Sequence, residues 1–253
     1  MARDSKKTGG FRWRLWLGLS LAGLLSVATA MAALKVVAYI SVDPRFMLSA
    51  NSRDAVAIQG LTYAARAKVL NVFAADLGRG VFSVPLAERR RRLLAVDWVQ
   101  DASVSRVWPN RLLVRIHERK PVAFVSFRSG PMLVDAEGVL LALPPRARFA
   151  FPVIDGLSQD DAAQRRQGVA AFLRFQQDMG YLSNDVSEVD VADPSGLRVV
   201  ARVENRAVEL ILGDGDFAAR YQNFVSHYPE IRKESPDAGT FDLRLDDRIT
   251  ARK

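Results

Sequence analysis

The clearest pattern in the chain is an unbroken apolar segment near its N-terminus. Residues 15–34 read LWLGLSLAGLLSVATAMAAL, without a charged side chain. At about 1.5 Å of rise per residue, a helix of this length spans a hydrocarbon core of about 30 Å. Lys35 interrupts the run, but VVAYI continues it to Ile40, and a lysine near a helix end can reach the headgroups. The pattern therefore predicts a transmembrane helix over 15–40.

The charges beside this segment predict its orientation. Residues 1–14 carry a net charge of +4, which is half of the net charge of +8 of the whole chain. The positive-inside rule keeps such a tail in the cytoplasm and places the rest of the chain across the membrane. Trp13, Trp16 and Tyr39 suit the two interfaces. The leucines assigned to the anchor are Leu15, Leu17, Leu21, Leu24, Leu25 and Leu34.

A cleavable signal peptide is the alternative reading of the same segment. Ala28-Thr29-Ala30 resembles an A-x-A cleavage site after an apolar stretch. The apolar run continues past this tripeptide to Ile40, which favours an uncleaved anchor. A mature protein that begins at Met31 would decide for the signal peptide.

Between Val56 and Glu118 the periodicity predicts a β-α-α-β-β order. VAIQG, ending at Gly60, has the pattern of a strand that ends in a turn. Apolar residues at helical spacing follow over 61–73, and Pro85 suits the first turn of a second helix that runs to Val96. Alternating residues over 99–118, divided by Pro109-Asn110, predict a hairpin. The arginines at 89–92 are expected mostly on a solvated helix face, and contact with anionic lipid or an acidic partner is the alternative.

From Pro121 onward the pattern becomes mainly β. Two amphipathic helices are expected within this region, at 160–179 and 217–228. Short apolar runs and turns predict strands at 123–127, 132–135, 139–141, 186–191, 197–203, 208–212 and 240–245. The fold class is therefore α+β: one N-terminal transmembrane helix, a β-α-α-β-β domain, and a β-rich domain with a mixed or antiparallel sheet and flanking helices.

Composition and charge narrow the class of function. A chain of 253 residues, 49% hydrophobic, can bury the cores of one or two domains. Outside the N-terminal tail the charge is only mildly basic, which argues against nucleic-acid binding. The chain has no cysteine, so thiol nucleophiles and cysteine metal sites are excluded.

The sequence offers few candidates for catalytic or metal-binding residues. The two histidines, His117 and His227, have no G-x-S-x-G or comparable nucleophile signature near them. Gly213-Asp214-Gly215-Asp216 lacks the bidentate glutamate of a calcium loop, and is expected to form a turn and a helix N-cap. We therefore expect no catalytic residue, no metal and no cofactor.

Several motifs over 58–156 occur in the order and at the spacing of one known family: I-Q-G-L from Ile58, Trp98-Val99, Trp108-Pro109, Glu118-Arg119, Pro121-Val122-Ala123 and Leu133-Val134-Asp135. The chain resembles the POTRA module of the FtsQ/DivIB cell division proteins, followed by the start of their β-rich domain. The layout implied is a cytoplasmic tail (1–14), a transmembrane helix (15–40), a POTRA domain (45–120), a β domain (121–249) and a C-terminal tail (250–253). The POTRA motif residues are Gly60, Trp98, Val99, Val104, Arg106, Trp108, Pro109, Glu118, Arg119 and Pro121.

The resemblance implies a non-enzymatic scaffold of the division machinery in the inner membrane. Its N-terminus would be cytoplasmic and its body periplasmic, at the division septum. FtsB-like and FtsL-like proteins would bind a β-domain edge strand by β-augmentation, and other division proteins would contact the POTRA domain and anchor. An ordinary terminal strand without a partner is the alternative. The binding residues implied are Thr240, Phe241, Asp242, Leu243, Arg244, Leu245, Asp246 and Asp247.

Two other classes of function compete with this reading. POTRA domains also occur in transport and secretion components, but these usually continue into a transmembrane β-barrel, and no series of alternating ten-residue strands follows. A membrane-anchored cell-wall hydrolase or sensor is the other class, and muralytic activity of the purified body would reveal it.

Overall fold

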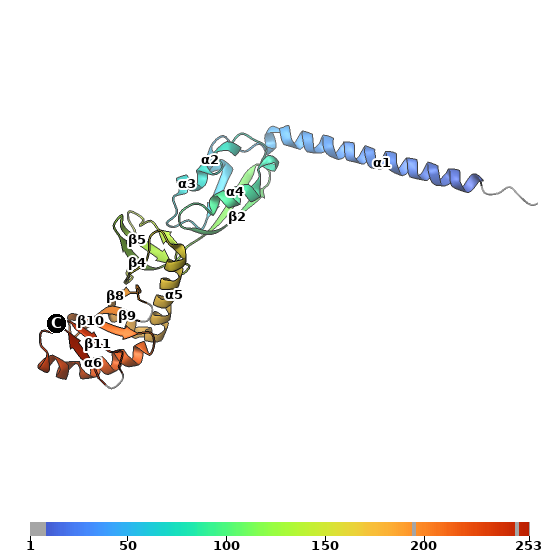
Figure 1. Cartoon of the computed structure of the whole chain (residues 1–253). Coiled ribbons are helices and arrows are strands. Elements are labelled where there is room, and N and C mark those ends of the chain that lie inside the picture. Colours follow the sequence, from blue (N-terminus) through green and yellow to red (C-terminus); the bar gives the residue numbers. More distant parts are fainter. Residues whose placement is uncertain (1–8, 194–195, 246–247, 253) are drawn as a thin grey trace, which may run out of the picture. The chain divides into compact units, whose positions relative to one another are not determined.

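The computed structural model describes residues 9–193, 196–245 and 248–252. The chain divides into two compact units, Met1–Glu118 and Arg119–Lys253. Figure 1 shows the elements of both units in chain order.

The apolar segment forms one continuous helix, α1 (Gly9–Val42). Its most apolar stretch, Leu19–Val36, is long and apolar enough to cross a membrane, with a mean hydropathy of 1.8 and no residue buried by the protein. The hydroxyls of Ser26 and Thr29 donate to backbone carbonyls one turn earlier, so these polar groups are satisfied within the helix. The prediction of an N-terminal apolar helix is confirmed.

The rest of the first unit has the predicted β-α-α-β-β order. Its sheet has the strand order β1-β3-β2, with β1 parallel and β2 antiparallel to β3. Val69 of α3 and Leu93 of α4 are buried, as are Leu112, Val114 and Ile116 on one face of β3. The elements are η1 (Pro44–Phe46), α2 (Ser52–Ala55), β1 (Val56–Gln59), α3 (Arg66–Asn71), η2 (Ala74–Asp76), η3 (Val81–Ser83), α4 (Leu86–Leu93), β2 (Val99–Val107) and β3 (Arg111–Glu118).

The helix α3 is shorter than the periodicity predicted, because the residues before it are held in another way. The Glu118 carboxylate accepts hydrogen bonds from the backbone N–H groups of Thr62, Tyr63 and Ala64 at 2.7–3.0 Å. Those N–H groups bind the end of β3, and the backbone is extended at Ala65 (ψ 110°), so the helix begins only at Arg66.

The arginines at 89–92 were expected to lie mostly outward on a solvated face of α4, and Arg89 is the exception. Arg89 is 6% exposed, and its guanidinium donates to both carboxylate oxygens of Asp76, which is 1% exposed, at 2.6 and 2.8 Å. The arginines at 90–92 are exposed, as expected. The sequence does not reveal which arginine is buried, because all four side chains carry the same charge and only the structure shows which one faces η2.

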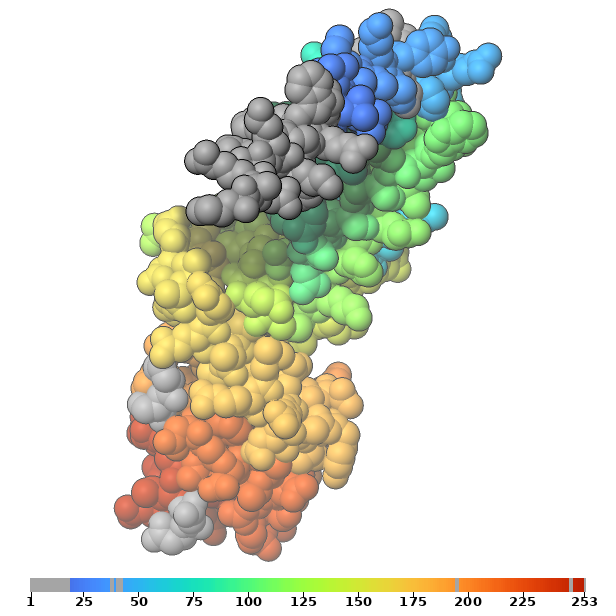
Figure 2. Space-filling model, turned by 90° about the vertical axis from the view of Figure 1, so that its right-hand side faces the viewer, coloured from blue at the N-terminus to red at the C-terminus, as the bar shows by residue number. Residues whose placement is uncertain are grey.

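The second unit is built on a mixed sheet with the strand order β12-β11-β10-β9-β8-β7-β4-β5-β6. Its strands are β4 (Pro121–Phe127), β5 (Gly130–Asp135), β6 (Leu140–Leu141), β7 (Val153–Asp155), β8 (Val186–Asp190), β9 (Leu197–Val203), β10 (Arg206–Gly213), β11 (Thr240–Asp242) and β12 (Thr250–Arg252). Two long helices, α5 (Ala162–Met179) and α6 (Phe217–Glu234), and the short η4 (Gly180–Asp185) complete it. In the space-filling view, residues of α5 and α6 form a large part of the surface of this unit (Figure 2).

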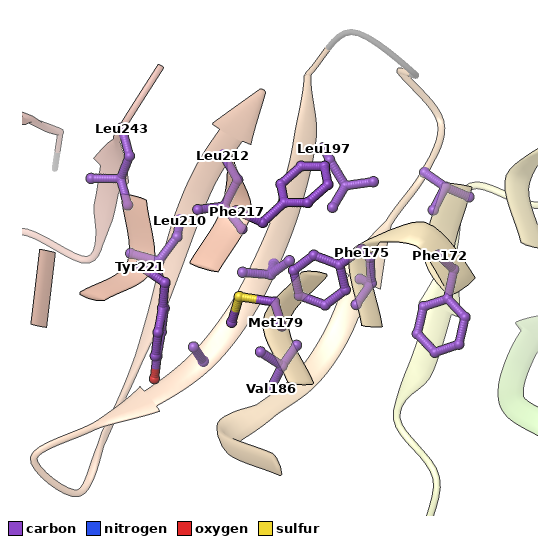
Figure 3. Packing of buried hydrophobic residues seen from close by; sticks show 14 of the residues in the cluster. Phe172, Phe175, Met179, Val186, Leu197, Leu210, Leu212, Phe217, Tyr221 and Leu243 are labelled. Atoms are coloured by element: carbon purple, nitrogen blue, oxygen red, sulfur yellow. The ribbon is translucent and has the colours of Figure 1, made fainter. Parts of the chain in front are cut away.

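The helices and the sheet share one core. Phe175 and Met179 of α5 lie close to Val186, while Phe217 of α6 lies between Leu197 and Leu212, and Tyr221 lies beside Leu210 (Figure 3). Phe172 of α5 belongs to the same core. All these side chains are buried, which is the expected result of amphipathic helices on an alternating sheet.

Two strands of this sheet were absent from the sequence prediction. β7 has three residues, lies just after Pro152, and pairs parallel to β4 and β8. β12 lies in the segment that was predicted to be a tail. The helix α6 also differs from the prediction, because it extends past Tyr228 and contains Pro229. Asp216 occupies its N-cap position, as expected, but the Asp216 side chain accepts no capping hydrogen bond.

Candidate partner-binding edge of the second unit

The predicted partner strand is not the outer edge of the sheet. β11 pairs parallel to β10 on one side and antiparallel to β12 on the other, with Thr240, Phe241 and Asp242 opposite Arg252, Ala251 and Thr250. The expectation that residues 240–247 form an unpaired edge is therefore wrong for β11 in the chain alone. The physical reason is that the chain turns back after β11 and its own last residues satisfy the backbone groups of that edge. Asp246 and Asp247 lie outside the described residues.

The inner side of β11 is held firmly. The Leu243 N–H donates to Ile211 O and the Glu209 N–H donates to Gly239 O, both at 2.9 Å. Phe241 is buried, with its ring centroid 4.9 Å from that of Phe224 on α6. The inner side of β11 is thus part of the core of the second unit.

A compact charge cluster lies on the same strand. The Asp242 carboxylate accepts hydrogen bonds from the Arg244 guanidinium at 2.7 and 2.9 Å, and Arg252 of β12 lies 3.5 Å from it. The hydrogen bond from the Arg244 side chain, aided by its backbone N–H and by the charge of Arg252, lowers the pKa of Asp242. The same bond raises the pKa of Arg244. Arg244 therefore folds back on its own strand.

An open groove runs beside this edge. Leu243, Leu245 and Ile249 line a hollow of about 310 Å³ together with residues of α6, namely Asp216, Ala219, Arg220 and Asn223. A second hollow of about 420 Å³ follows α6 further, past His227 and Ile231, and also contacts Ile249. Leu245 is 49% exposed although it is apolar. A strand exchange at β12 would uncover apolar surface next to free backbone groups.

Sequence reasoning missed the residues that the last segment contributes. Arg252 was assigned to the C-terminal tail, yet it approaches Asp242. Ile249, the last residue assigned to the β domain, lines the groove although no role was predicted for it. The opposite charges of Asp242 and Arg252 offered a hint, but a strand of three residues gives no readable alternation.

Several of the POTRA motif residues stabilise the fold of the first unit. Gly60 has φ +81°, and an added Cβ would meet Ile116 O at 2.1 Å, so no other residue fits there. The Arg106 guanidinium donates to the carbonyls of Val81, Phe82 and Val84. Trp98, Val99 and Ala102 are buried, whereas Trp108, before Pro109, is 77% exposed. Val104 lies on β2 and Pro121 begins β4.

Arg119 acts in the second unit. Its guanidinium donates to Asp135 at 2.6 Å, and the other oxygen of Asp135 accepts from the N–H groups of Glu137 and Val139. Arg119 and Asp135 thereby fix the turn between β5 and β6.

The described residues hold no group of three or more histidine and acidic side chains that could bind a metal ion. His117 is exposed on β3, and His227 is exposed on α6 with its Nδ1 2.9 Å from Asn223 O. The anchor leucines lie along α1.

Comparison with known proteins shows which proteins the chain resembles. Residues 52–119 match the FtsQ-type POTRA domain. The chain is 34% identical over 215 residues to the cell division protein FtsQ of Koribacter versatilis, which is 81% of this chain and 60% of that protein. It is 30% identical over 158 residues to FtsQ of Actinobacillus pleuropneumoniae, and 29% identical over 148 residues to FtsQ of Caulobacter vibrioides.

The aligned stretches cover 60% and 58% of this chain in the second and third comparisons, and 63% and 49% of those relatives. The chain thus spans about half to two thirds of the length of the relatives that it matches. The POTRA motif residues, the observed β-α-α-β-β domain and the large mixed sheet agree with these findings: the chain contains an FtsQ-type POTRA domain and is similar to FtsQ cell division proteins.

Proposed function

We propose that this protein is a non-enzymatic scaffold of the division machinery that holds other division proteins at the septum. The observation that carries the proposal is the end of the second sheet, where a firmly held strand, β11, is covered only by the short strand β12 beside an open groove. The relatives are named as cell division proteins, which supports the same role.

The membrane part of the proposal rests on α1. An apolar helix with exposed side chains fits a single-pass anchor. The basic excess in residues 1–14 supports a cytoplasmic N-terminus and a periplasmic body in the inner membrane. The FtsQ-type POTRA domain, 52–119, and the anchor would contact further division proteins.

The partner at the sheet edge would be a strand of an FtsB-like protein, itself in complex with an FtsL-like one. We infer that this strand takes the place of β12 on β11. β12 pairs through three residues, and Thr250 and Arg252 are exposed, so a longer partner strand would make more backbone hydrogen bonds than β12 does. Leu245 and Ile249 would then offer apolar contacts in the groove.

A binding measurement tests this assignment. The full-length protein in detergent would be immobilised, and binding of the FtsB-like and FtsL-like pair would be measured for the parent, for Arg244→Glu, and for a chain that ends at Ile249. Arg202→Glu is the matched control, because Arg202 is an exposed arginine on β9, away from the sheet end.

Strand exchange predicts that removal of 250–253 strengthens binding, that Arg244→Glu weakens it at least tenfold, and that Arg202→Glu leaves it unchanged. Loss of binding on removal of 250–253 would instead show that the partner adds to β12. If Arg244→Glu bound as tightly as the parent, the assigned edge would be wrong.

A further inference from the structure

An aromatic patch lies on the surface of the first unit. It consists of Phe46, Met47, Phe82, Val107 and Trp108. Phe46 stands between the two other rings, with centroid distances of 5.7 Å to Phe82 and 6.3 Å to Trp108. Trp108 is 77% and Phe82 47% exposed, and Met47 and Val107 are also exposed. Three segments distant in sequence thus place their apolar side chains together at the surface.

The backbone beneath this aromatic patch is held in place. Met47 forms a β-bridge with Gly80, and the Leu48 N–H donates to Arg79 O at 2.9 Å. The Arg106 guanidinium donates to three carbonyls of the segment that carries Phe82, at 2.8–3.1 Å. The exposed rings are therefore presented by a fixed frame.

The core of the unit does not need these side chains. Leu48, Val81 and Val84, which are neighbours of the patch residues in sequence, point inward and are nearly fully buried. Phe82 lies between two of them and points outward. Contiguous apolar surface that the fold leaves outside, on a fixed frame, marks an interaction surface.

The patch is close to the membrane anchor along the chain. Only Asp43 separates α1, which ends at Val42, from η1, which contains Phe46. At no more than about 3.6 Å per residue, the Cα atom of Phe46 lies within about 14 Å of that of Val42. Residues of α1 also contact η1 and η3, the segment of Phe82. Tyr39, exposed near the end of α1, is another aromatic side chain suited to the interface.

We propose that the aromatic patch rests in the interface of the phospholipid bilayer that α1 spans. Tryptophan and other aromatic rings favour the headgroup level, where one end of the ring is apolar and the other wet. Arg45, next to Phe46 in η1, and Arg79, whose carbonyl accepts from Leu48, are exposed and can contact lipid phosphates. The patch then limits rotation of the POTRA domain about the anchor. This inference rests on the proposed membrane anchoring.

Fluorescent labels can locate the patch, because the chain has no cysteine and each introduced thiol is unique. Met47→Cys and Val107→Cys keep all three rings and would carry an environment-sensitive dye. The full-length protein is placed in vesicles of phosphatidylethanolamine and phosphatidylglycerol, with either a spin label on the lipid or a quencher in the water. Leu25→Cys reports on the anchor, and Tyr181→Cys, at a residue 78% exposed in the second unit, reports on a solvated surface.

The proposal predicts that the labels at 47 and 107 are quenched by the lipid spin label at least twofold more than the label at 181. Adding Phe82→Ser and Trp108→Ser to the Val107→Cys chain should reduce this quenching to the level at 181. An unchanged circular dichroism spectrum and unfolding midpoint of that variant would show that it still folds; Trp108→Ser alone is the milder substitute.

Other outcomes separate the inference from the anchoring. If the label at 25 is quenched by lipid while those at 47 and 107 behave like the one at 181, the anchor stands and the patch proposal is overturned. If the label at 25 is not quenched by lipid, the anchoring itself is wrong and the patch proposal falls with it. Labels at 47 and 107 that neither quencher reaches would show a protein contact instead of lipid, which also contradicts the proposal.

Discussion

The buried Arg89–Asp76 pair leads to a sharp stability prediction. Arg89→Met keeps most of the side-chain volume but leaves the Asp76 carboxylate, 1% exposed, without the two hydrogen bonds at 2.6 and 2.8 Å. Breaking a buried ion pair from one side costs about 3–5 kcal/mol, because an uncompensated charge stays in the interior. We expect the first unit to lose that much stability, which is a large share of the about 5–15 kcal/mol of a typical domain.

The neighbouring arginines supply the controls. Arg91 is exposed on the same helix, so Arg91→Met should change stability by no more than about 0.5 kcal/mol. The double variant Asp76→Leu with Arg89→Met removes both charges, and should lie within about 1 kcal/mol of the parent, since a hydrophobic pair can replace a buried ion pair.

Amide hydrogen exchange gives the stability of this unit within the full-length protein. Peptides that cover β2 and β3 would be followed by mass spectrometry in detergent, and the slowest amides report the free energy of unfolding of the unit. A loss below about 1 kcal/mol for Arg89→Met would refute the reasoning, as would equal losses for Arg89→Met and Arg91→Met.

Three further predictions follow from other contacts. Glu118→Gln removes the charge that binds the N–H groups of Thr62, Tyr63 and Ala64, and should lower the stability of this region by about 1.5–3 kcal/mol. Faster amide exchange over 60–66 would measure this loss, whereas the control Glu137→Gln should not affect those amides. Phe241→Ala should destabilise the second unit by about 3–5 kcal/mol in chemical denaturation, whereas Leu245→Ala should leave its stability within about 0.5 kcal/mol and weaken partner binding; the opposite ranking would contradict the burial of these side chains. Because the pKa of Asp242 is lowered from its usual 3.8, its ion pairs with Arg244 and Arg252 stabilise the fold above that pH and are lost as the pH falls through the folded value. Protection of amides at 250–252, corrected for intrinsic rates, should therefore fall in acid for the parent and be low and less pH-dependent in Asp242→Asn.

The features that the sequence predicted are those in which one pattern continues over many residues. The helix α5, Ala162–Met179, lies within the range expected from its apolar spacing, and the β2–β3 hairpin follows the alternation on both sides of Pro109. The apolar run gave α1 in the same way. In each of these elements many residues carry the same pattern, so one atypical residue does not hide it.

The features that the sequence did not predict depend on contacts between distant residues. β7 and β12 have three residues each, too few for a pattern, and both are strands because neighbouring strands pair with them. Arg89 is indistinguishable by type from the three arginines that follow it, and only its contact with Asp76 explains its burial. The candidate site was located by family resemblance at β11, but the strand that covers it could be found only in three dimensions.

Division in living cells tests the proposed scaffold most directly. Cells depleted of this protein would be supplied with the parent, with Arg244→Glu, or with the control Arg202→Glu. Each variant would be present in the membrane in the same amount, and septa would be scored by microscopy. We expect the parent and Arg202→Glu to restore septa, and Arg244→Glu to leave filaments without septa. Normal division in the depleted cells that receive no copy would contradict the account.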